Sequence, residues 1–286
     1  MAQLLDGKEV ARSMTQRIQD KVRALRERDV CPTLAIVRVG DDPSDRSYEK
    51  GALKRAERVG VRVRRHIYDE DISQAELLEE IEGLNQDETV HGVLIFRPLP
   101  SQIDDETVRT ALLPEKDVDG ITEGSLAGIF TGSHLGFAPC TARACMEILD
   151  HYHIDLTGKR TVVLGRSLVI GKPVAMMVME KNATVTICHS RTDADEIMEI
   201  CKQSDVLIAA MGRAAMVDGR YMKAGQIVLD VGINVTEEGK LCGDVKFEEA
   251  GETDFITPVP GGVGAVTTAV LMLQVVEAAA VQSQNA

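Results

Sequence analysis

The chain has 286 residues, 44% of them hydrophobic, and 32 Lys and Arg against 45 Asp and Glu give a net charge of −13. This length allows two domains, each with a substantial core. The negative charge disfavours a general role in binding nucleic acid or an anionic membrane, although local basic groups can still bind an anionic cofactor. The N-terminus lacks a signal-peptide core, and we expect no apolar run to approach the roughly 20 residues of a membrane span. Six cysteines without a C-x-x-C pair are typical of free thiols in a cytoplasmic protein.

The first half of the sequence alternates predicted helices and strands. Apolar residues recur at helical spacing or in short β-branched runs, and turn residues such as Gly60 separate them. A capping box, in which Ser73 precedes Glu76 by three residues, marks one helix start. Strands that alternate with helices favour a mainly parallel sheet. In chain order the pattern predicts a helix over 6–27, a strand over 34–39, a helix over 45–58, a strand over 61–67, a helix from 73, a strand over 92–96 and a loop-rich section over 114–141.

One stretch of the second half has the pattern of a strand, a glycine turn, a helix and another strand. A β-branched run at 161–164 leads into Gly165, and the helix is predicted to begin near Gly171 and Pro173. Such a βαβ unit directs backbone N–H groups and a helix N-terminus at a phosphate. The other elements predicted in this half are a helix over 142–151, strands over 184–187, 205–209 and 226–231, and a C-terminal helix over 263–281.

Basic and hydroxyl side chains in this βαβ unit favour NADP over NAD. A 2′-phosphate is bound by hydroxyl and guanidinium donors, whereas NAD sites commonly place an Asp or Glu at the end of the second strand. Here that position holds Ser190 and Arg191, and Arg166 and Ser167 follow Gly165 in the first turn. The usual G-x-G-x-x-G pattern is absent, so an ordinary surface loop with scattered basic residues is the alternative interpretation.

Several short motifs follow one another along nearly the whole chain. They are VGDDP at 39–43 with Ser47-Tyr48, PLP at 98–100, KDVDG at 116–120, PCT at 139–141, GRS at 165–167, DVGIN at 230–234 and TPVPGGVG at 257–264. The last is highly specific. In content and order these motifs resemble the bifunctional methylenetetrahydrofolate dehydrogenase/cyclohydrolase family.

The resemblance implies two α/β domains with a folate-binding cleft between them. Residues 1–141 are expected to form the catalytic, folate-binding domain, with a C-terminal helix over 265–286 that packs back onto it. Residues 142–264 are expected to form a Rossmann-like domain that binds NADP, as most of the family does, rather than NAD. The resemblance further implies a homodimer in the cytoplasm that acts in one-carbon metabolism and purine biosynthesis, without a metal, nucleic-acid or membrane partner.

The resemblance also assigns site residues by motif. Tyr48 resembles the residue that stacks on the folate, and Asp119 resembles the carboxylate that anchors the pterin by accepting its N–H groups. These two, together with Arg97, are the predicted catalytic residues. The predicted substrate-binding set is Tyr48, Asp119, Pro260, Gly261 and Gly262, and the predicted cofactor-binding set is Gly165, Arg166, Ser167, Ser190, Arg191, Ile233 and Thr267. Asp117, beside Asp119, is interpreted as a loop cap, and a share in the substrate role is the alternative.

Two positions differ from the family pattern. The family has a catalytic Lys four residues after the Tyr, and a Gln two residues before Pro-Leu-Pro that contacts it. This chain has Ala52 and Phe96 there. Lys50 and Lys54 are predicted to point away, because at about 100° per residue they lie roughly 200° and 240° round the helix from Tyr48.

Arg97 is the better candidate for a replacement cation, because it enters beside the missing Gln. An arginine cannot act as a base at neutral pH, and a surface arginine is the alternative interpretation. The hypothesis is therefore an NADP-dependent dehydrogenase that converts methylenetetrahydrofolate to methenyltetrahydrofolate, with reduced hydrolysis to formyltetrahydrofolate. Two alternatives are a non-catalytic paralogue that binds folate and dinucleotide, and a dehydrogenase for a different one-carbon carrier.

Overall fold

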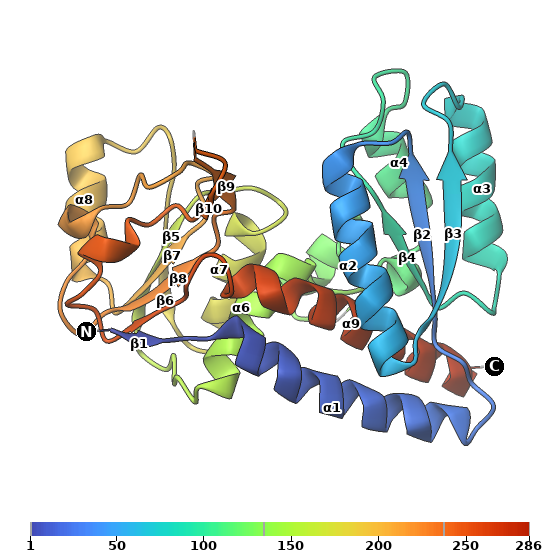
Figure 1. The fold of residues 1–286 in the computed structure, drawn as a ribbon, viewed down its shortest axis with the longest axis horizontal. Helices are drawn as coiled ribbons and strands as arrows, with labels where there is room; N and C mark the ends of the chain where they lie inside the picture. Colours follow the sequence, from blue (N-terminus) through green and yellow to red (C-terminus); the bar gives the residue numbers. More distant parts are fainter. Residues whose placement is uncertain (1, 134, 237, 286) are drawn as a thin grey trace. The chain divides into compact units, whose positions relative to one another are not determined.

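The computed structural model describes residues 2–133, 135–236 and 238–285. It contains two compact units (Figure 1). The described residues among 1–12 and 141–267 form the first unit, and those among 13–140 and 268–286 form the second. Each unit is built on a parallel sheet, which confirms the predicted α/β class. The expected cleft, and the role expected of each domain, stay predictions at this point.

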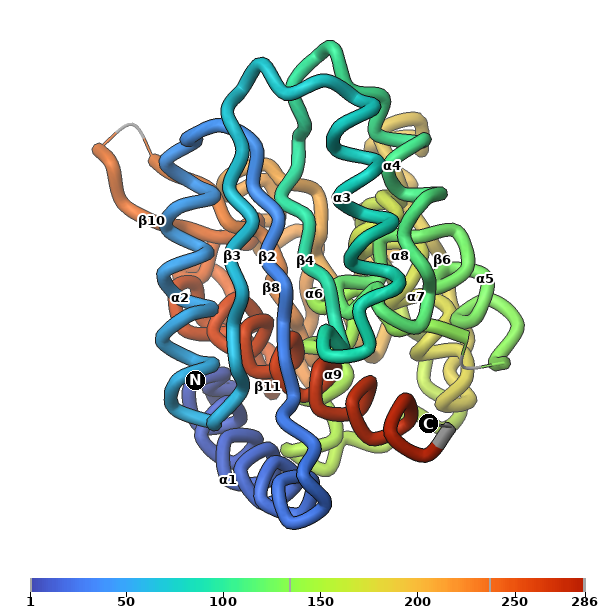
Figure 2. Tube along the Cα trace, turned by 90° about the vertical axis from the view of Figure 1, so that its right-hand side faces the viewer, coloured from blue at the N-terminus to red at the C-terminus, as the bar shows by residue number. Residues whose placement is uncertain are grey.

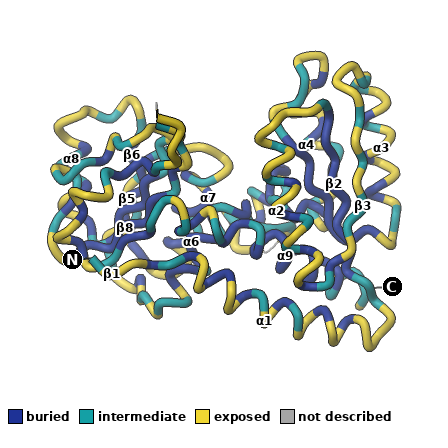
Figure 3. Tube along the Cα trace, in the orientation of Figure 1, coloured by how far each residue is buried: buried dark blue, intermediate teal, exposed yellow. Residues whose placement is uncertain are grey.

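The second unit has a three-stranded parallel sheet. Its elements are α1 (Gly7–Arg26), which begins in the first unit, β2 (Thr33–Val39), α2 (Pro43–Val59), β3 (Arg62–Tyr68), α3 (Gln74–Gln86), β4 (Gly92–Ile95), α4 (Asp105–Ala111), a short turn of 3-10 helix (Pro114–Lys116), α5 (Glu123–Thr131) and most of α9 (Val263–Asn285). β2 is the central strand: Leu34 pairs with Val63 of β3 on one side and with Gly92 of β4 on the other (Figure 2). β2 is buried along its whole length, whereas every residue of β3 is exposed or partly exposed (Figure 3).

The core of this unit lies between the sheet and α3. Val37 and Val93 of the sheet pack in one cluster with Leu77 and Ile81 of α3. The predicted capping box at the start of α3 is confirmed, because the Ser73 side chain and the N3 glutamate exchange hydrogen bonds with each other's backbone N–H. Local helix signals and apolar burial therefore agree in this half of the chain.

The first unit has a six-stranded parallel sheet in the order β1-β11-β8-β7-β5-β6. Its elements are β1 (Gln3–Leu4), α6 (Cys140–His151), β5 (Arg160–Leu164), α7 (Gly171–Glu180), β6 (Thr184–Cys188), α8 (Ala194–Gln203), β7 (Val206–Ala209), β8 (Ile227–Asp230), β9 (Asn234–Val235), β10 (Leu241–Cys242), β11 (Phe255–Ile256) and 3-10 turns at Gly219–Tyr221 and Phe247–Glu249. The predicted βαβ unit is confirmed as β5-α7-β6. The short strands β1 and β11, the hairpin of β9 and β10, and α8 were not predicted.

The C-terminal helix corrects one expectation. Residues Val263–Gln284 of α9 are long and apolar enough to cross a membrane, although we expected no such run. In the apolar window of this helix 67% is buried inside the protein, which is typical of the core helix of a soluble fold. Apolar length alone therefore does not indicate a membrane span in this chain.

The section over 114–141 was predicted to be rich in loops, but it contains α5. Asp117 is fully buried, and its carboxylate accepts hydrogen bonds from the backbone N–H of Ile121 (3.0 Å) and Thr122 (2.7 Å) and from Oγ of Ser125 (2.7 Å). Thr122 in turn caps the helix by accepting from the Ser125 N–H. The interpretation of Asp117 as a loop cap is confirmed, and the cap explains how a glycine-containing segment forms a helix.

Replacing Asp117 by alanine is expected to destabilise the second unit by about 3 kcal/mol, because it leaves three buried donors without an acceptor. Thermal unfolding followed by circular dichroism measures the loss. Asp104→Ala, which removes the exposed cap of α4, is the matched control and is expected to cost less. An Asp117→Ala variant as stable as the Asp104→Ala variant would contradict the assignment.

Candidate active site

The carboxyl end of the second unit's sheet is where its topology predicts a ligand. The chain leaves β2 towards β3 on one side, whereas β4 lies on the other side of β2. Parallel α/β sheets bind ligands beyond the carboxyl ends of strands at such a switch point. One loop begins at Gly40, directly after β2, and another begins at Phe96, directly after β4. Both loops therefore start at this edge of the sheet.

Tyr48 and Ala52 lie one turn apart on α2, beside this edge. The ring of Tyr48 meets the ring of Phe96 edge to face, with centroids 5.9 Å apart. Ala52 is fully buried and Phe96 is 8% exposed. Lys50 is exposed and lines a different cavity, of about 460 Å³, together with Arg38 of β2 and Arg65 of β3. The two positions that differ from the family pattern are thus buried and apolar, and one of them contacts the ring of Tyr48. The exposure of Lys50 agrees with the direction predicted for it.

Asp119 is brought to the same edge by a bridge between Val93 and Asp117. The bridge is parallel, so Asp119 lies level with the end of β4, where Phe96 and Arg97 follow. Burial raises the pKa of Asp119 to about 7, and repulsion from the Asp117 carboxylate acts in the same direction. A hydrogen bond from Cys140 and the charge of Arg97 oppose this rise in pKa. The pKa of Asp119 is therefore well above that of an ordinary aspartate.

Arg97 is anchored within this unit. Its Nη1 lies 3.1 Å from Oδ2 of Asp105, which also accepts from Nε of Arg109 at 2.9 Å. The Arg97 side chain is 26% exposed, and its charge acts on Asp119. Arg97 is therefore placed to balance the negative charge at this edge, while its fixed protonation prevents it from replacing an amine base.

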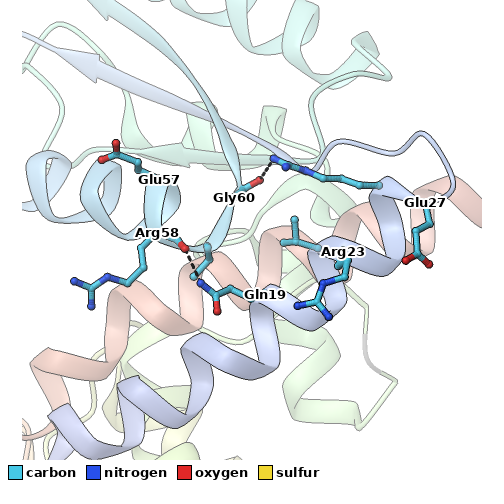
Figure 4. A pocket seen from close by; sticks show the side chains of 9 residues that line it. Gln19, Arg23, Glu27, Glu57, Arg58 and Gly60 are labelled. Atoms are coloured by element: carbon cyan, nitrogen blue, oxygen red, sulfur yellow. Dashed lines mark hydrogen bonds between the residues drawn. The ribbon is translucent and has the colours of Figure 1, made fainter.

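A larger cavity of the same unit lies away from this group. It has a volume of about 660 Å³ and lies between α1 and the C-terminal end of α2 (Figure 4). Gln19 donates to the carbonyl oxygen of Arg58, and Arg26 donates to that of Gly60, both at 2.8 Å. These bonds satisfy carbonyl groups at the end of α2, so the side chains join two helices.

The first unit has its own switch point, between β5 and β7. Gly165 follows β5 with a φ of +120°, and a Cβ there would collide with the backbone oxygen of Ala210, which follows β7. A Cβ on Gly171 would likewise collide with the Gly165 oxygen. Only glycine fits both places, so the backbone of this turn passes close to the start of α7. This is the arrangement that the phosphates of a dinucleotide require.

The basic residues of the predicted cofactor site follow neighbouring strands. Leu164 pairs with Cys188, and the N–H of Gly165 donates to the Cys188 carbonyl at 2.8 Å. The loops that carry Arg166 and Arg191 therefore begin at one edge of the sheet. The whole set of Arg166, Ser167, Ser190 and Arg191 is exposed. Exposed guanidinium and hydroxyl groups beside a glycine turn fit the adenosine end of NADP.

Two buried carboxylates, which the sequence analysis did not single out, hold the next loops. Asp230 accepts hydrogen bonds from the N–H groups of Gly232, Asp244 and Val245 at 2.9–3.0 Å, and burial raises its pKa to about 6. Asp244 accepts from the N–H groups that follow β7 and from Nδ2 of Asn234 (2.9 Å). The loops after β7 and β8 are therefore tied together. No spacing of charged residues in the sequence signals this.

Ile233 and the start of α9 come together at the end of these loops. Ile233 is 64% exposed, and a Cβ on Gly264 would lie 3.1 Å from its side chain. Thr267 is 9% exposed, and its hydroxyl donates to the Gly264 carbonyl at 3.1 Å. Gly262, just before α9, has no room for a Cβ against Thr257 and Pro258. The TPVPGGVG segment thus forms a close-packed support below the exposed Ile233.

The described residues 2–133, 135–236 and 238–285 contain no group of three or more His, Cys, Asp or Glu side chains that could hold a metal. Cys188 is buried as the last residue of β6, and Nδ1 of His189 accepts a hydrogen bond from the N–H of Arg191 in its own loop. That the reaction uses no metal remains a prediction.

Two family models match this chain. The model for the tetrahydrofolate dehydrogenase/cyclohydrolase catalytic domain matches residues 5–119, and the model for the NAD(P)-binding domain of that family matches residues 139–283. The chain belongs to this family. The predicted resemblance, the two-domain fold and the NADP-binding domain are thereby confirmed.

Relatives match this chain over nearly its whole length. It is 44% identical over 279 residues to the bifunctional protein FolD of Clostridium kluyveri, covering 97% of this chain and 98% of that protein. It is 45% identical over 284 residues to that of Clostridioides difficile, covering 99% and 98%. The solved FolD of Campylobacter jejuni, described as a methylenetetrahydrofolate dehydrogenase/cyclohydrolase, has a TM-score of 0.95 at 37% identity, covering 98% and 99%. FolD of Trypanosoma brucei, complexed with NADP and an inhibitor, has a TM-score of 0.91 at 32% identity, covering 100% and 99%.

Proposed function

We propose that this protein is an NADP-dependent methylenetetrahydrofolate dehydrogenase whose cyclohydrolase activity is strongly reduced. One observation carries the second half of the proposal: Ala52 and Phe96 are buried and apolar beside Tyr48, where the family pattern has an amine and an amide. Retention of Asp119 and of the glycine turn at Gly165 supports the first half. The relatives whose names include both activities supply the reaction class.

The cofactor role rests on the turn after β5 and the loop after β6. The turn offers backbone N–H groups without side-chain obstruction, and Arg166, Ser190 and Arg191 offer donors for a 2′-phosphate. NADP supplies the hydride acceptor when it is bound. Ile233 and Thr267 are proposed to lie beside the nicotinamide, because they form one surface at the end of β8 and the start of α9.

The substrate role rests on Asp119 and Tyr48. The ionised Asp119 can accept two N–H groups from the aminopyrimidinone edge of a pterin. Tyr48 presents an aromatic ring, held from one side by Phe96, against which the folate can stack. Pro260, Gly261 and Gly262 are proposed to contact the folate as well. Oxidation then depends chiefly on holding the methylene group near the cofactor, because the substrate's own nitrogen supplies the electron pair.

Hydrolysis of the methenyl product makes a different demand. Water must be activated and protons must be moved, for which a positioned side chain with a suitable pKa typically contributes about 10²–10⁴-fold. Ala52 and Phe96 cannot carry a proton, and Arg97 stays protonated and paired with Asp105. We therefore expect the protein to retain dehydrogenase activity while its cyclohydrolase activity is strongly reduced.

An assay with methylenetetrahydrofolate and NADP, recorded for NADPH and for methenyl absorbance together, tests the proposal. NADPH formation with accumulation of methenyl product is expected. NADPH formation without accumulation would contradict the loss of hydrolysis. Binding of both ligands without turnover would favour a non-catalytic paralogue, which Ala52 and Phe96 also allow, and failure to bind reduced folates would favour a different one-carbon carrier.

The preference for NADP should depend on the guanidinium groups of Arg166 and Arg191. Replacing either by alanine is expected to raise the KM for NADP by about 10–100-fold, the value of a charge-assisted hydrogen bond. The KM for NAD should change less than threefold by the same reasoning, because NAD lacks the 2′-phosphate. Arg160→Ala, at the opposite end of β5, is the control and should alter neither constant. Equal losses with both cofactors would contradict the assignment.

The assembly and the location follow from the family resemblance alone. We propose a homodimer in the cytoplasm, and sedimentation equilibrium would test the first part. A mass equal to that of one 31.1 kDa chain at micromolar concentration would contradict it.

A further inference from the structure

A single buried glutamine interrupts the apolar core of α9. Gln274 is fully buried, and apolar residues such as Leu273 and Val275 flank it. Its Nε2 donates to the carbonyl oxygen of Val118 at 2.7 Å and to that of Ala138 at 3.0 Å. A buried amide on an apolar helix needs such partners, and here both partners are backbone oxygens from two loops of the same unit.

The two loops that Gln274 joins are packed directly against each other. Gly120 has a φ of +70°, and a Cβ there would collide with the backbone of Ala138 and Pro139. The Cys140 thiol donates to the Val118 carbonyl at 3.4 Å, and Nε2 of Gln274 lies 3.5 Å from the Cys140 sulfur. Val118 is therefore fixed from two directions, and the next residue in the chain is Asp119.

The single S–H proton of Cys140 is within reach of two acceptors, the Val118 carbonyl and the Asp119 side chain, and its hydrogen bond to Asp119 lowers the pKa of that carboxyl. The other groups that face this carboxyl are Asp117, which raises its pKa, and Arg97, which lowers it. Lys116 belongs to the same segment, but its ammonium group donates to the carbonyl oxygens of Leu84 and Asp87. The thiol is thus the near donor on one side of Asp119, opposite in effect to Asp117.

We propose that Cys140 and Gln274 are positioning residues of the active site, which hold the Asp119 carboxylate in the orientation that binds the folate. Gln274 fixes the backbone before Asp119, and Cys140, which lies between that backbone and the carboxylate, donates its one S–H proton to the carboxylate when Asp119 is ionised. This inference rests on the role proposed above for Asp119. It adds to that role two residues, far apart in the sequence, that control how Asp119 meets its ligand.

A purely structural role for Gln274 is the competing explanation, and the chain contains a matched control. Gln282 lies two turns further along α9, and its Nε2 also donates to two backbone carbonyls, those of His91 (2.9 Å) and Glu115 (3.0 Å). Neither carbonyl adjoins Asp119 in the chain. Cys145, another buried cysteine of α6, is the corresponding control for Cys140.

The test compares Gln274→Leu with Gln282→Leu, and Cys140→Ala with Cys145→Ala, in the full chain. The first measurement needs no ligand: ¹³C NMR of aspartate-labelled protein follows the titration of Asp119, assigned with Asp119→Asn. Loss of the thiol donor, or its displacement, removes a stabilising contact of the ionised form. Gln274→Leu and Cys140→Ala are therefore expected to raise the pKa of Asp119 above the wild-type value, whereas the two controls leave it unchanged.

The second measurement is steady-state turnover. Gln274→Leu and Cys140→Ala should raise the KM for methylenetetrahydrofolate roughly tenfold, as a misplaced binding group does, and leave the KM for NADP within about twofold. Cys140→Ser, which keeps a donor, should recover most of the loss. Unchanged Asp119 titration in both variants, or equal effects in the two controls, would overturn the proposal.

The proposed function and the positioning role can be contradicted separately. Wild-type protein that does not oxidise methylenetetrahydrofolate would overturn the proposed function, while a raised Asp119 pKa in the two variants would still support the positioning role. Normal wild-type turnover with an unaltered Asp119 titration and unaltered folate KM in both variants would overturn the positioning role alone.

Discussion

Replacing Ala52 by lysine and Phe96 by glutamine in the same chain is expected to raise the hydrolysis of methenyltetrahydrofolate by about 100-fold or more over the unmodified protein. The lower limit is the usual contribution of a positioned general acid or base. Position 52 lies one turn after Tyr48 on α2, so a lysine there would extend along the Tyr48 face. A glutamine at position 96 would replace the ring that now contacts Tyr48 and would give the amine a hydrogen-bonding partner.

The single substitutions should not reach this gain, because the two positions depend on each other. Ala52→Lys alone places an ammonium group at a fully buried position beside an aromatic ring, which is expected to destabilise the second unit by several kcal/mol. Phe96→Gln alone removes the ring contact with Tyr48 and supplies no amine. The coupling is measured by hydrolysis rates and thermal unfolding of both single variants and the double variant.

Lys54→Ala is the control for this series, because Lys54 is exposed on α2 and is predicted to point away from Tyr48. It should change neither hydrolysis nor stability. A gain in Ala52→Lys equal to that of the double variant would show that Phe96 is not part of the obstruction. An unmodified protein that already hydrolyses the methenyl compound at a rate comparable with the double variant would contradict the proposed loss.

The sequence predicted the regular parts of both sheets because apolar, β-branched runs mark central strands such as β2 and β5, which are buried over nearly their whole length. The run at β2 and the run at β5 are continuous and apolar, and turn residues bound them, so periodicity and composition agreed. The strands β1 and β11, which lie next to each other at one side of the six-stranded sheet, have two residues each, too few for a periodic pattern to be recognised. α5 was missed because Gly124 and Gly128 weaken its local signal, and its start depends on the buried Asp117.

The residues of the candidate site also differ in whether the sequence alone could point to them. Residues in contiguous motifs, such as Arg166 with Gly165, could be predicted because one turn carries them. Partners such as Asp244 and Gln274 could not, because their role depends on contacts with loops that are remote in the sequence, and a lone Asp or Gln has many ordinary uses. The contact between Tyr48 and Phe96 could not be predicted either, because the two residues are far apart in the sequence and only the fold brings their rings together.

Replacing Asp119 by alanine is expected to lower kcat/KM for methylenetetrahydrofolate by about 1,000-fold or more, with little change in the KM for NADP. A carboxylate that accepts two N–H groups contributes two charge-assisted hydrogen bonds, and their combined loss accounts for this magnitude. The proposed cofactor loops belong to the first unit and are held by carboxylates of that unit such as Asp230, so they should keep their affinity. Initial rates at saturating NADP give the first constant, and rates at saturating folate give the second.

The ionisation of Asp119 should also appear in the pH dependence of the wild-type protein. Only the ionised form accepts two N–H groups, and burial raises the pKa of this carboxyl to about 7. Below that value the protonated form predominates, so kcat/KM for the folate should fall about tenfold for each pH unit and should level off above it. Cys140→Ala, which removes a donor that lowers this pKa, should move the midpoint to higher pH. Asp87→Asn, in the turn before β4 at the opposite edge of the sheet, should leave the midpoint unchanged. A flat profile from pH 5 to pH 8, in steps of about one pH unit, would show that the Asp119 charge does not control folate binding.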